Sequence, residues 1–300
     1  MRATTLSGHS NPIYTVITHP NEELLYTAGN DKGIVEWDIL KGTPNRIFKQ
    51  IKNTVYSLEI IPENNLLIAG CNDGNICFFD LITTKLIGSL SAGSAIFQLK
   101  YIAHKKELIA STDQGLIFII NPLEQKVIHQ FPSGKQKVRS FAIHQNLALL
   151  ATVSNDEMVR IYHLEDYIFI HEFKGHDLGI GSVSFSPDGI HLITGGRDAH
   201  LKVWEVNKWT NQADFAAHLF AIYKITYHPN KPYFATASRD KSIKIWRAED
   251  FSLFKNLSIE KAKEGHRLSV NDICWSANGE HLLSVSDDKF LKIWDFELGI

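Results

Sequence analysis

The chain has 300 residues, of which 44% are hydrophobic and 21% charged, and its formal net charge is −2 at pH 7. This composition is typical of a globular protein and excludes a disordered or fibrous one. The near-neutral charge does not favour general attraction to nucleic acid or to an acidic membrane surface. We expect no signal peptide and no membrane helix, because no apolar segment is long enough. The cysteines Cys71, Cys77 and Cys274 favour buried thiols in a reducing compartment, so a cytoplasmic location is expected.

One spacing recurs four times along the chain. A histidine that follows Gly or Ala is followed by Asp at a constant distance and by Trp six positions after that Asp, and a Ser or Thr stands four positions before the Asp. The four sets are His9, Thr27, Asp31 and Trp37; His176, Thr194, Asp198 and Trp204; His218, Thr236, Asp240 and Trp246; and His266, Ser284, Asp288 and Trp294. Such constant spacing indicates that one structural unit is repeated.

Weaker copies of this unit fill the gaps between the four sets. Aligned on the residue six after each Asp, the seven units carry Trp37, Phe79, Ile119, Tyr162, Trp204, Trp246 and Trp294. These positions recur at nearly constant intervals, and the last interval is the longest. We therefore expect a single domain over residues 1–300, with repeats that end near Asp38, Asp80, Ile120, His163, Glu205, Arg247 and Asp295.

Each unit is predicted to contain four short strands. The strand that ends at the aligned position covers, in chain order, Ile34–Trp37, Ile76–Phe79, Leu116–Ile119, Val159–Tyr162, Leu201–Trp204, Ile243–Trp246 and Leu291–Trp294. Several of these segments alternate apolar and charged residues, which is typical of half-buried strands. A strand precedes the Asp, as at Leu192–Gly195; one follows the His, as at Ser182–Ser186; and one follows the Trp, as at Phe251–Leu257. Turn-forming residues such as Pro20-Asn21 and Pro187-Asp188-Gly189 separate the strands.

Four short strands in each of seven units predict an all-β propeller. Along its whole length the chain resembles the WD-repeat β-propeller family, since Trp37-Asp38 and Trp294-Asp295 are the dipeptide that names it. The resemblance implies a seven-bladed ring of four-stranded antiparallel blades. The second, third and fourth repeats depart from the family pattern because they lack the His, and Ala69 and Ile109 stand at the hydroxyl positions of the second and third.

The ends of the chain predict how the ring closes. Only six residues follow Trp294, too few for a fourth strand in the last unit. We expect Arg2–Leu6 to pair with the outer edge of the last blade, which closes the ring and covers a strand edge.

The Ser/Thr, His and Asp of each set are the residue types of a nucleophilic triad. We interpret them as structural, because an active site occurs once in a chain whereas this set occurs four times. The expected arrangement is a buried hydrogen-bonded tetrad in which the His bonds to the Asp, the hydroxyl to the His, and the Trp indole N–H donates inward. The resemblance implies the same tetrad. We expect no enzymatic activity, no cofactor and no metal, because phosphate-binding, dinucleotide and Cys-x-x-Cys motifs are missing.

The loops that carry the His and the Asp should emerge on one face of the ring, called the top face here. Two positions per repeat should surround the central channel on that face. The positions five residues after the His are Tyr14, Tyr56, Phe97, Arg139, Gly181, Tyr223 and Asn271, with a shift of one residue needed for Phe97. The positions just before the Asp are Asn30, Asn72, Thr112, Asn155, Arg197, Arg239 and Asp287. The residues predicted to bind a partner are Tyr14, Tyr56, Phe97, Arg139, Arg197, Tyr223, Arg239, Asn271 and Asp287.

The predicted function is a non-catalytic scaffold, monomeric by default, that binds a protein or peptide on the top face. Aromatic side chains beside arginines are enriched at binding hot spots, and the arginines would suit an acidic or phosphorylated segment. Three alternatives remain: the tyrosines pack between blades and the arginines pair with local carboxylates; a metal or acid/base site makes the propeller an enzyme; or the ring binds nucleic acid. The six extra residues of the last interval, Ile259–Glu264, are expected to form a solvated loop or a rim contact.

Overall fold

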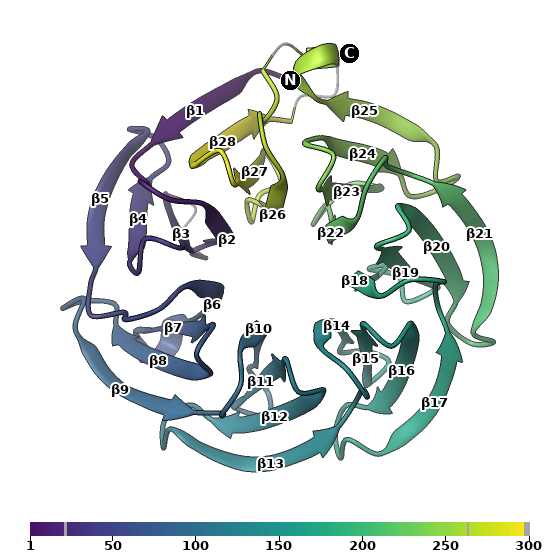
Figure 1. Cartoon of the computed structure of the whole chain (residues 1–300), viewed down its shortest axis with the longest axis horizontal. Helices are drawn as coiled ribbons and strands as arrows, with labels where there is room; N and C mark the ends of the chain where they lie inside the picture. The colour runs from purple at the N-terminus through teal and green to yellow at the C-terminus, as the bar shows by residue number, and fades with distance from the viewer. Residues whose placement is uncertain (21–22, 263, 297–300) are drawn as a thin grey trace.

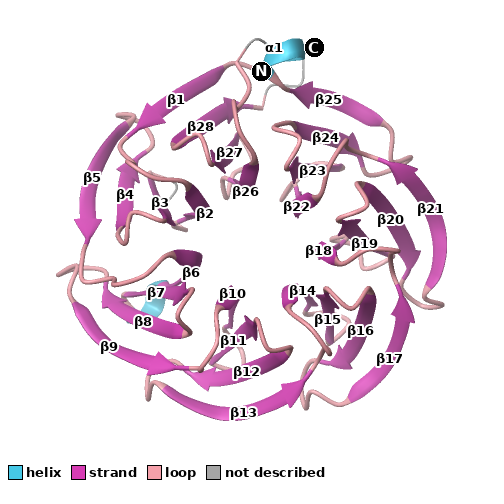
Figure 2. Ribbon diagram, in the orientation of Figure 1, coloured by secondary structure: helices cyan, strands magenta, loops and turns pink. Residues whose placement is uncertain are grey.

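The apolar segments of the repeats form β-strands in the computed structural model, which describes residues 1–20, 23–262 and 264–296. Within these residues the strands form seven four-stranded antiparallel sheets, arranged as blades around a central opening (Figure 1). Short elements add little helix to this part of the chain: the 3-10 turn η1 (Pro62–Asn64) and the helix α1 (Ile259–Ala262) (Figure 2). The predicted all-β, seven-bladed propeller is confirmed.

The blades follow one another in chain order, each with its first strand at the channel and its last at the outer rim (Figure 1). Blade 1 contains β2 (Ile13–Thr18), β3 (Leu24–Gly29), β4 (Ile34–Asp38) and β5 (Thr43–Phe48). Blade 2 contains β6 (Val55–Ile61), β7 (Leu66–Cys71), β8 (Asn75–Asp80) and β9 (Leu86–Ser91). Blade 3 contains β10 (Ile96–Ile102), β11 (Glu107–Thr112), β12 (Leu116–Asn121) and β13 (Lys126–Pro132). Blade 4 contains β14 (Val138–His144), β15 (Leu149–Ser154), β16 (Met158–His163) and β17 (Phe169–Lys174).

The remaining blades repeat this order. Blade 5 contains β18 (Ile180–Phe185), β19 (His191–Gly196), β20 (His200–Glu205) and β21 (Thr210–Ala216). Blade 6 contains β22 (Ile222–Tyr227), β23 (Tyr233–Ser238), β24 (Ile243–Arg247) and β25 (Leu253–Leu257). Blade 7 contains β26 (Val270–Trp275), β27 (His281–Ser286) and β28 (Phe290–Asp295), and its outer strand is β1 (Ala3–Ser7).

Ring closure by the N-terminal strand is confirmed. β1 pairs antiparallel with β28, with Ala3 opposite Trp294 and Ser7 opposite Phe290. The strand therefore lies one residue later in the chain than the predicted Arg2–Leu6. Leu6 is 6% exposed and belongs to the core between blades 7 and 1, so the closing strand contributes apolar burial as well as backbone pairing.

The third repeat corrects the sequence alignment by one residue. Leu108 pairs with Ile120 in blade 3 as Leu67 pairs with Phe79 in blade 2. The aligned position is therefore Ile120 and not Ile119, and by the same register the hydroxyl position is Ala110 and not Ile109. The alignment failed because it placed Asp113 at the position of the repeat Asp. The Asp113 backbone N–H donates to the Ala95 carbonyl oxygen, as the Asn72 N–H donates to the Thr54 carbonyl oxygen in blade 2. Asp113 therefore occupies the position before the repeat Asp.

This register also changes one position near the channel. Asp113, rather than Thr112, is the blade 3 equivalent of Asn72. Thr112 is fully buried, and its hydroxyl donates to the Leu116 carbonyl oxygen at 2.9 Å. Phe97 then precedes Ile120 by the same distance as Tyr56 precedes Phe79, so the one-residue shift that the sequence seemed to need disappears.

The core lies in layers between neighbouring blades. Between blades 1 and 2, for example, Tyr26, Phe48, Val55, Leu58 and Phe79 are all buried in one cluster. Each blade is a thin sheet, and its two faces are buried by the blades on either side. A blade therefore depends on both neighbours for its core.

The inserted segment before blade 7 differs from the expectation, and one of its residues lies outside the described part of the chain. The inserted segment Ile259–Glu264 is not wholly loop, since its first four residues form α1. Glu264 accepts a hydrogen bond from the Ala3 backbone N–H at 2.8 Å, which ties the insertion to the closing strand. Lys263 and the predicted turn residue Asn21 lie outside the described residues.

Candidate functional site

The four repeated sets form the predicted hydrogen-bonded tetrads. In blade 6 the Thr236 hydroxyl lies 2.7 Å from His218 Nε2 and 2.9 Å from Trp246 Nε1, and His218 Nδ1 lies 2.9 Å from Asp240. The tetrads of blades 1, 5 and 7 repeat these contacts, with histidine-to-hydroxyl distances of 2.7–2.8 Å and indole-to-hydroxyl distances of 2.7–3.0 Å. The geometry is that of a structural network repeated around the ring.

One arrangement of protons satisfies the whole network in blade 6. Burial lowers the pKa of His218 despite the nearby Asp240 carboxylate, so the imidazole is neutral near pH 7. Trp246 Nε1 then donates to the Thr236 oxygen, the Thr236 hydroxyl to His218 Nε2, and His218 Nδ1 to Asp240. Burial alone would raise the pKa of Asp240, but hydrogen bonds from His218, Ser242 and the Leu219 N–H hold it below its usual value. Each polar group has a partner, and no hydroxyl is left for nucleophilic attack.

Blade 4 shows how a repeat without the histidine satisfies the same positions. The Thr152 hydroxyl lies 2.6 Å from Ser133 Oγ, and Asp156 accepts two hydrogen bonds from Arg160 at 2.9 and 3.1 Å. The Arg160 guanidinium thus replaces the histidine as the partner of the repeat Asp. Sequence reasoning missed this pair, although an i, i+4 Asp-Arg spacing was visible.

A bulge in every inner strand directs one side chain toward the channel. In blade 1 the pairing of β2 with β3 passes from Ile13 directly to Thr15, so that Tyr14 has no opposite residue. The other six blades have the same irregularity at the same place. The seven bulged residues are Tyr14, Tyr56, Phe97, Arg139, Gly181, Tyr223 and Asn271, the set predicted from the sequence. Bulges commonly re-aim side chains in this way.

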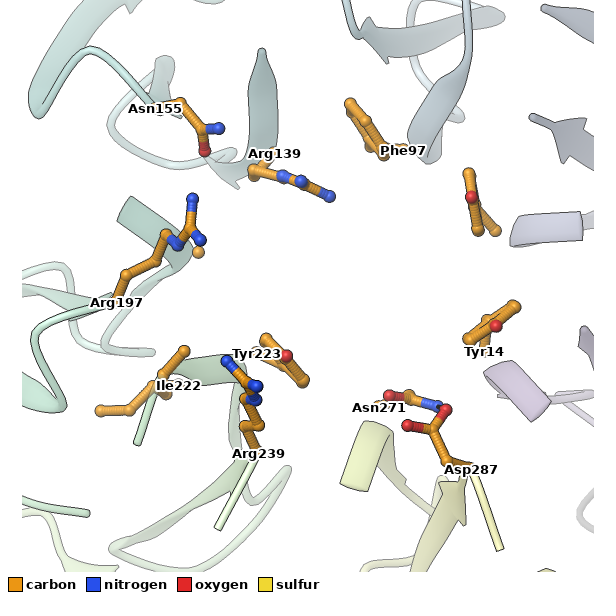
Figure 3. Close-up of a pocket in the computed structure, with 13 residues that line it drawn as sticks. Tyr14, Phe97, Arg139, Asn155, Arg197, Ile222, Tyr223, Arg239, Asn271 and Asp287 are labelled. Carbon is orange, nitrogen blue, oxygen red and sulfur yellow. Dashed lines mark hydrogen bonds between the residues drawn. The ribbon is translucent and has the colours of Figure 1, made fainter. Parts of the chain in front are cut away.

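These bulged residues line a cavity of about 450 Å³ at the mouth of the channel. All nine residues predicted to bind a partner line it: Tyr14, Tyr56, Phe97, Arg139, Arg197, Tyr223, Arg239, Asn271 and Asp287. Asn155, Gly181, Ala221 and Ile222 complete the lining. Figure 3 shows Asn155 and Ile222 at the cavity. Ala221 and Ile222 were not predicted, since they are the apolar residues that precede a bulge and carry no sequence signal of their own.

Not every position before a repeat Asp reaches the cavity. Asn30 and Asn72 are outside its lining, and the Asn30 side-chain oxygen accepts a hydrogen bond from Thr54 at 2.7 Å. The Asn155 oxygen, by contrast, is buried at the cavity without a hydrogen-bond partner among the described residues.

The first half of the ring gives the cavity an aromatic wall. The Tyr14 and Tyr56 rings meet edge to face with centroids 5.5 Å apart, and Tyr56 stacks on Phe97 at 5.9 Å. Arg139 continues this row, with its guanidinium carbon 4.4 Å from the centre of the Phe97 ring. The wall therefore crosses four consecutive blades and ends in a positive charge.

The second half of the cavity is cationic. Arg139 and Arg197 lie on one side and Arg239 next to Tyr223 (Figure 3). All three arginines are exposed to the cavity, and within the described residues none forms an ion pair with a carboxylate. Partial removal from water, together with the charge of Arg197, lowers the pKa of Arg139. An anion between the two guanidiniums would relieve this repulsion.

The carboxylate that lines the cavity belongs to blade 7 and is already hydrogen-bonded. Asn271 Nδ2 donates to Asp287 Oδ1 and to the Ile13 carbonyl oxygen, both at 2.8 Å. Burial, followed by the Asp287 charge, raises the pKa of Tyr14, which stays a neutral hydrogen-bond donor near pH 7. Among the described residues, Asp287 forms no ion pair with Arg139, Arg197 or Arg239.

Among the described residues, no group of three or more His, Cys, Asp or Glu side chains could hold a metal ion. In the same part of the chain, no helix is long and apolar enough to span a membrane.

Seven four-stranded blades, four His-Asp tetrads and a ring closed by the N-terminal strand define a WD-type β-propeller. The family model "WD domain, G-beta repeat" matches residues 2–38, 42–80, 125–163, 168–205, 209–247 and 258–295, and the chain belongs to this family. Blade 3, whose sequence departs from the repeat, falls mostly in the unmatched segment between residues 80 and 125.

Several curated proteins are similar to part of the chain. The p21-activated protein kinase-interacting protein 1-like of Danio rerio is 26% identical over 53% of the chain and 43% of its own length. The WD repeat-containing protein 26 homolog of Arabidopsis thaliana is 24% identical over 62% of the chain and 39% of its own length. The COMPASS component SWD3 of Saccharomyces cerevisiae is 27% identical over 42% of the chain and 47% of its own length. The chain thus spans less than half the length of these relatives.

Proposed function

We propose that the protein is a non-catalytic scaffold that binds a protein or peptide partner in the cavity on its top face. The observation that carries this proposal is the set of three arginines, Arg139, Arg197 and Arg239, exposed to the cavity without a carboxylate partner among the described residues. Guanidinium groups facing an aromatic wall are the combination found at binding hot spots.

The partner segment is acidic or phosphorylated. A carboxylate or phosphate can accept two parallel hydrogen bonds from one guanidinium, and such charge-assisted bonds are stronger than neutral ones. The names of two relatives, a kinase-interacting protein and a complex component, support a protein as the partner.

The arrangement of the polar groups favours binding over catalysis. The hydroxyl, imidazole and carboxylate groups of the tetrads are hydrogen-bonded to one another, as in blade 6. Among the described residues that line the cavity, the carboxylate is that of Asp287, which is held by Asn271. We also propose a cytoplasmic location, because Cys71, Cys77 and Cys274 are free thiols.

Affinity purification of the full chain followed by mass spectrometry tests the proposal. The test variant is Arg197→Ala with Arg239→Ala, and the matched control is Lys208→Ala with Arg247→Ala, which removes the same charge from residues outside the cavity lining. Truncation of hot-spot arginines costs about 1–4 kcal/mol each, so the cavity variant should lose a partner by about tenfold or more. The unfolding temperatures of both variants should stay near that of the wild type.

A partner retained equally by the wild type and both variants would contradict the cavity as its binding site. A partner lost from the control but kept by the cavity variant would place the interaction elsewhere on the ring. If the purified chain catalysed a metal-dependent reaction and both double variants kept that activity, the enzyme alternative would be favoured.

A further inference from the structure

We propose that the rim of blades 5, 6 and 7 extends the cationic half of the cavity into a two-part docking surface. Its partner is a segment in which an acidic group stands close to bulky apolar side chains. The acidic group binds the arginines and the apolar side chains lie on the rim. The inference rests on the proposed function and specifies the partner of the same site.

The rim is formed by one position of the loop that enters each blade. In blades 5, 6 and 7 this position is Leu178, Phe220 and Leu268, which are 52%, 55% and 47% exposed. The residue before Phe220, Leu219, is 82% exposed. We call these four residues the apolar rim. Single exposed apolar side chains are common on proteins, but their recurrence at one position of three consecutive blades is not explained by folding.

The other four blades are polar at this position. Equivalence is fixed by a backbone hydrogen bond that each blade repeats, for example from Arg197 N to the Gly179 oxygen in blade 5 and from Asn155 N to the Lys137 oxygen in blade 4. The residue before each acceptor is the rim position. In blades 1 to 4 it is Asn11, Asn53, Ser94 and Gln136. The apolar rim is therefore confined to one sector of the ring.

Two blades of that sector, blades 5 and 6, also hold an arginine before the repeat Asp, whereas blade 7 holds Asp287. Arg197 follows the rim of blade 5 and Arg239 that of blade 6, each through the repeated backbone bond. The Arg239 guanidinium carbon lies 5.8 Å from the centre of the Phe220 ring, so charge and apolar surface are in direct contact. Ala221, Ile222 and Tyr223 continue from Phe220 into the cavity. A bound chain can thus touch both parts without a gap.

In blades 6 and 7 the tetrad Asp and a nearby Ser hold the rim loop in place before a partner arrives. The Leu219 N–H donates to Asp240 at 3.0 Å, and the Phe220 carbonyl oxygen accepts from Ser238 Oγ at 3.1 Å. In blade 7 the Arg267 N–H donates to Asp288 at 2.9 Å, and the Leu268 carbonyl oxygen accepts from Ser286 Oγ at 3.3 Å. Loops fixed in this way lose little conformational freedom on binding. In these two blades the tetrad Asp therefore helps to support a preformed surface.

Peptide selection from a random-sequence phage library, displayed to the immobilised full chain, tests the inference. The wild type should enrich peptides in which Asp or Glu stands near Leu, Ile, Phe or Trp. The rim variant Leu178→Ser, Phe220→Ser, Leu268→Ser should still enrich acidic peptides but lose the apolar preference. It should bind synthetic copies of the wild-type peptides about tenfold more weakly. The control Asn11→Ser, Asn53→Ser, Gln136→Ser alters the polar sector and should select as the wild type does.

The outcomes separate this inference from the proposed function. Acidic peptides without apolar residues, bound equally by the rim variant, would overturn the two-part surface and leave the arginine site standing. Enrichment that does not depend on Arg197 and Arg239 would overturn both. Resynthesis of the selected peptides with phosphoserine at the acidic position distinguishes the two anions: tighter binding assigns the site to phosphate and weaker binding to carboxylate. Either result retains the two-part surface if the rim variant weakens binding of the preferred form.

Discussion

Replacing Thr236 by Val removes the hydroxyl that joins two members of the blade 6 tetrad while it keeps the shape of the side chain. The hydroxyl accepts from Trp246 Nε1 at 2.9 Å and donates to His218 Nε2 at 2.7 Å. Thr236 is fully buried, and His218 and Trp246 are each 5% exposed. Water therefore cannot replace the lost oxygen without opening the blade.

The expected cost follows from the two groups left without a partner. A buried donor or acceptor that loses its only hydrogen bond costs about 1–3 kcal/mol, so both together cost about 2–6 kcal/mol. The added methyl group recovers roughly 0.8 kcal/mol by burial. We expect the free energy of unfolding to fall by about 1–5 kcal/mol, a large share of the roughly 5–15 kcal/mol typical of a folded protein.

Thr152→Val in blade 4 is the matched control. Thr152 is 1% exposed, but its hydroxyl bonds to Ser133 Oγ at 2.6 Å, and neither His nor Trp depends on it. We expect a loss of about 1 kcal/mol, because the Ser133 hydroxyl is the single side-chain group left unpaired. Urea denaturation followed by tryptophan fluorescence measures both variants. Equal losses, or a loss below about 1 kcal/mol for Thr236→Val, would refute the tetrad as a cooperative unit.

Two further predictions concern the ring as a whole. Deletion of residues 1–7 exposes the outer edge of β28 and removes the buried Leu6, so the unfolding temperature in circular dichroism should fall; an unchanged temperature would mean that β1 does not hold the ring closed. Burial lowers the pKa of His9 and His218 below the usual 6.5, so the unfolded chain binds protons that the folded chain excludes as the pH falls below that value. Stability should therefore be complete near pH 7 and decrease toward about pH 5, and a calorimetric midpoint that is constant over this range would contradict the neutral tetrads.

The ring could be predicted from the sequence because its hydrogen-bonded residues are few and regularly spaced. His, Asp and Trp of one tetrad must meet across three strands and a loop, so a change in strand length between them would break the network. Blade 3 has no such constraint, since Ala110 and Ile120 replace the hydroxyl and the Trp. The alignment failed there by one residue for that reason, and strand pairing was needed to correct it.

The sequence predicted which positions surround the channel, but it did not predict the contacts that their side chains make. Each bulged residue precedes the aligned position of its blade by the same distance, so spacing alone identified Tyr14 and Arg139 as channel residues. Whether a charged residue at such a position forms an ion pair depends on the direction of its side chain, and residue spacing gives no information about that direction. Asp287 meets Asn271, whereas Arg197 meets no carboxylate among the described residues. The apolar rim was also missed, although Leu178, Phe220 and Leu268 each stand two residues after the repeat His. Its restriction to one sector became visible only when the shared backbone bond also aligned the three blades without that His.

The polar groups of the tetrads stabilise the fold, whereas the arginines of the cavity do not. Buried polar groups are tolerated when each has a partner, and those of the blade 6 tetrad all have one. The cavity arginines are exposed instead, and none of them has a carboxylate partner among the described residues. Grouping like charges lowers the stability of the free ring, so folding does not explain Arg139 beside Arg197. An anionic partner does, because the same repulsion that is unfavourable in the free protein becomes binding energy when the anion arrives.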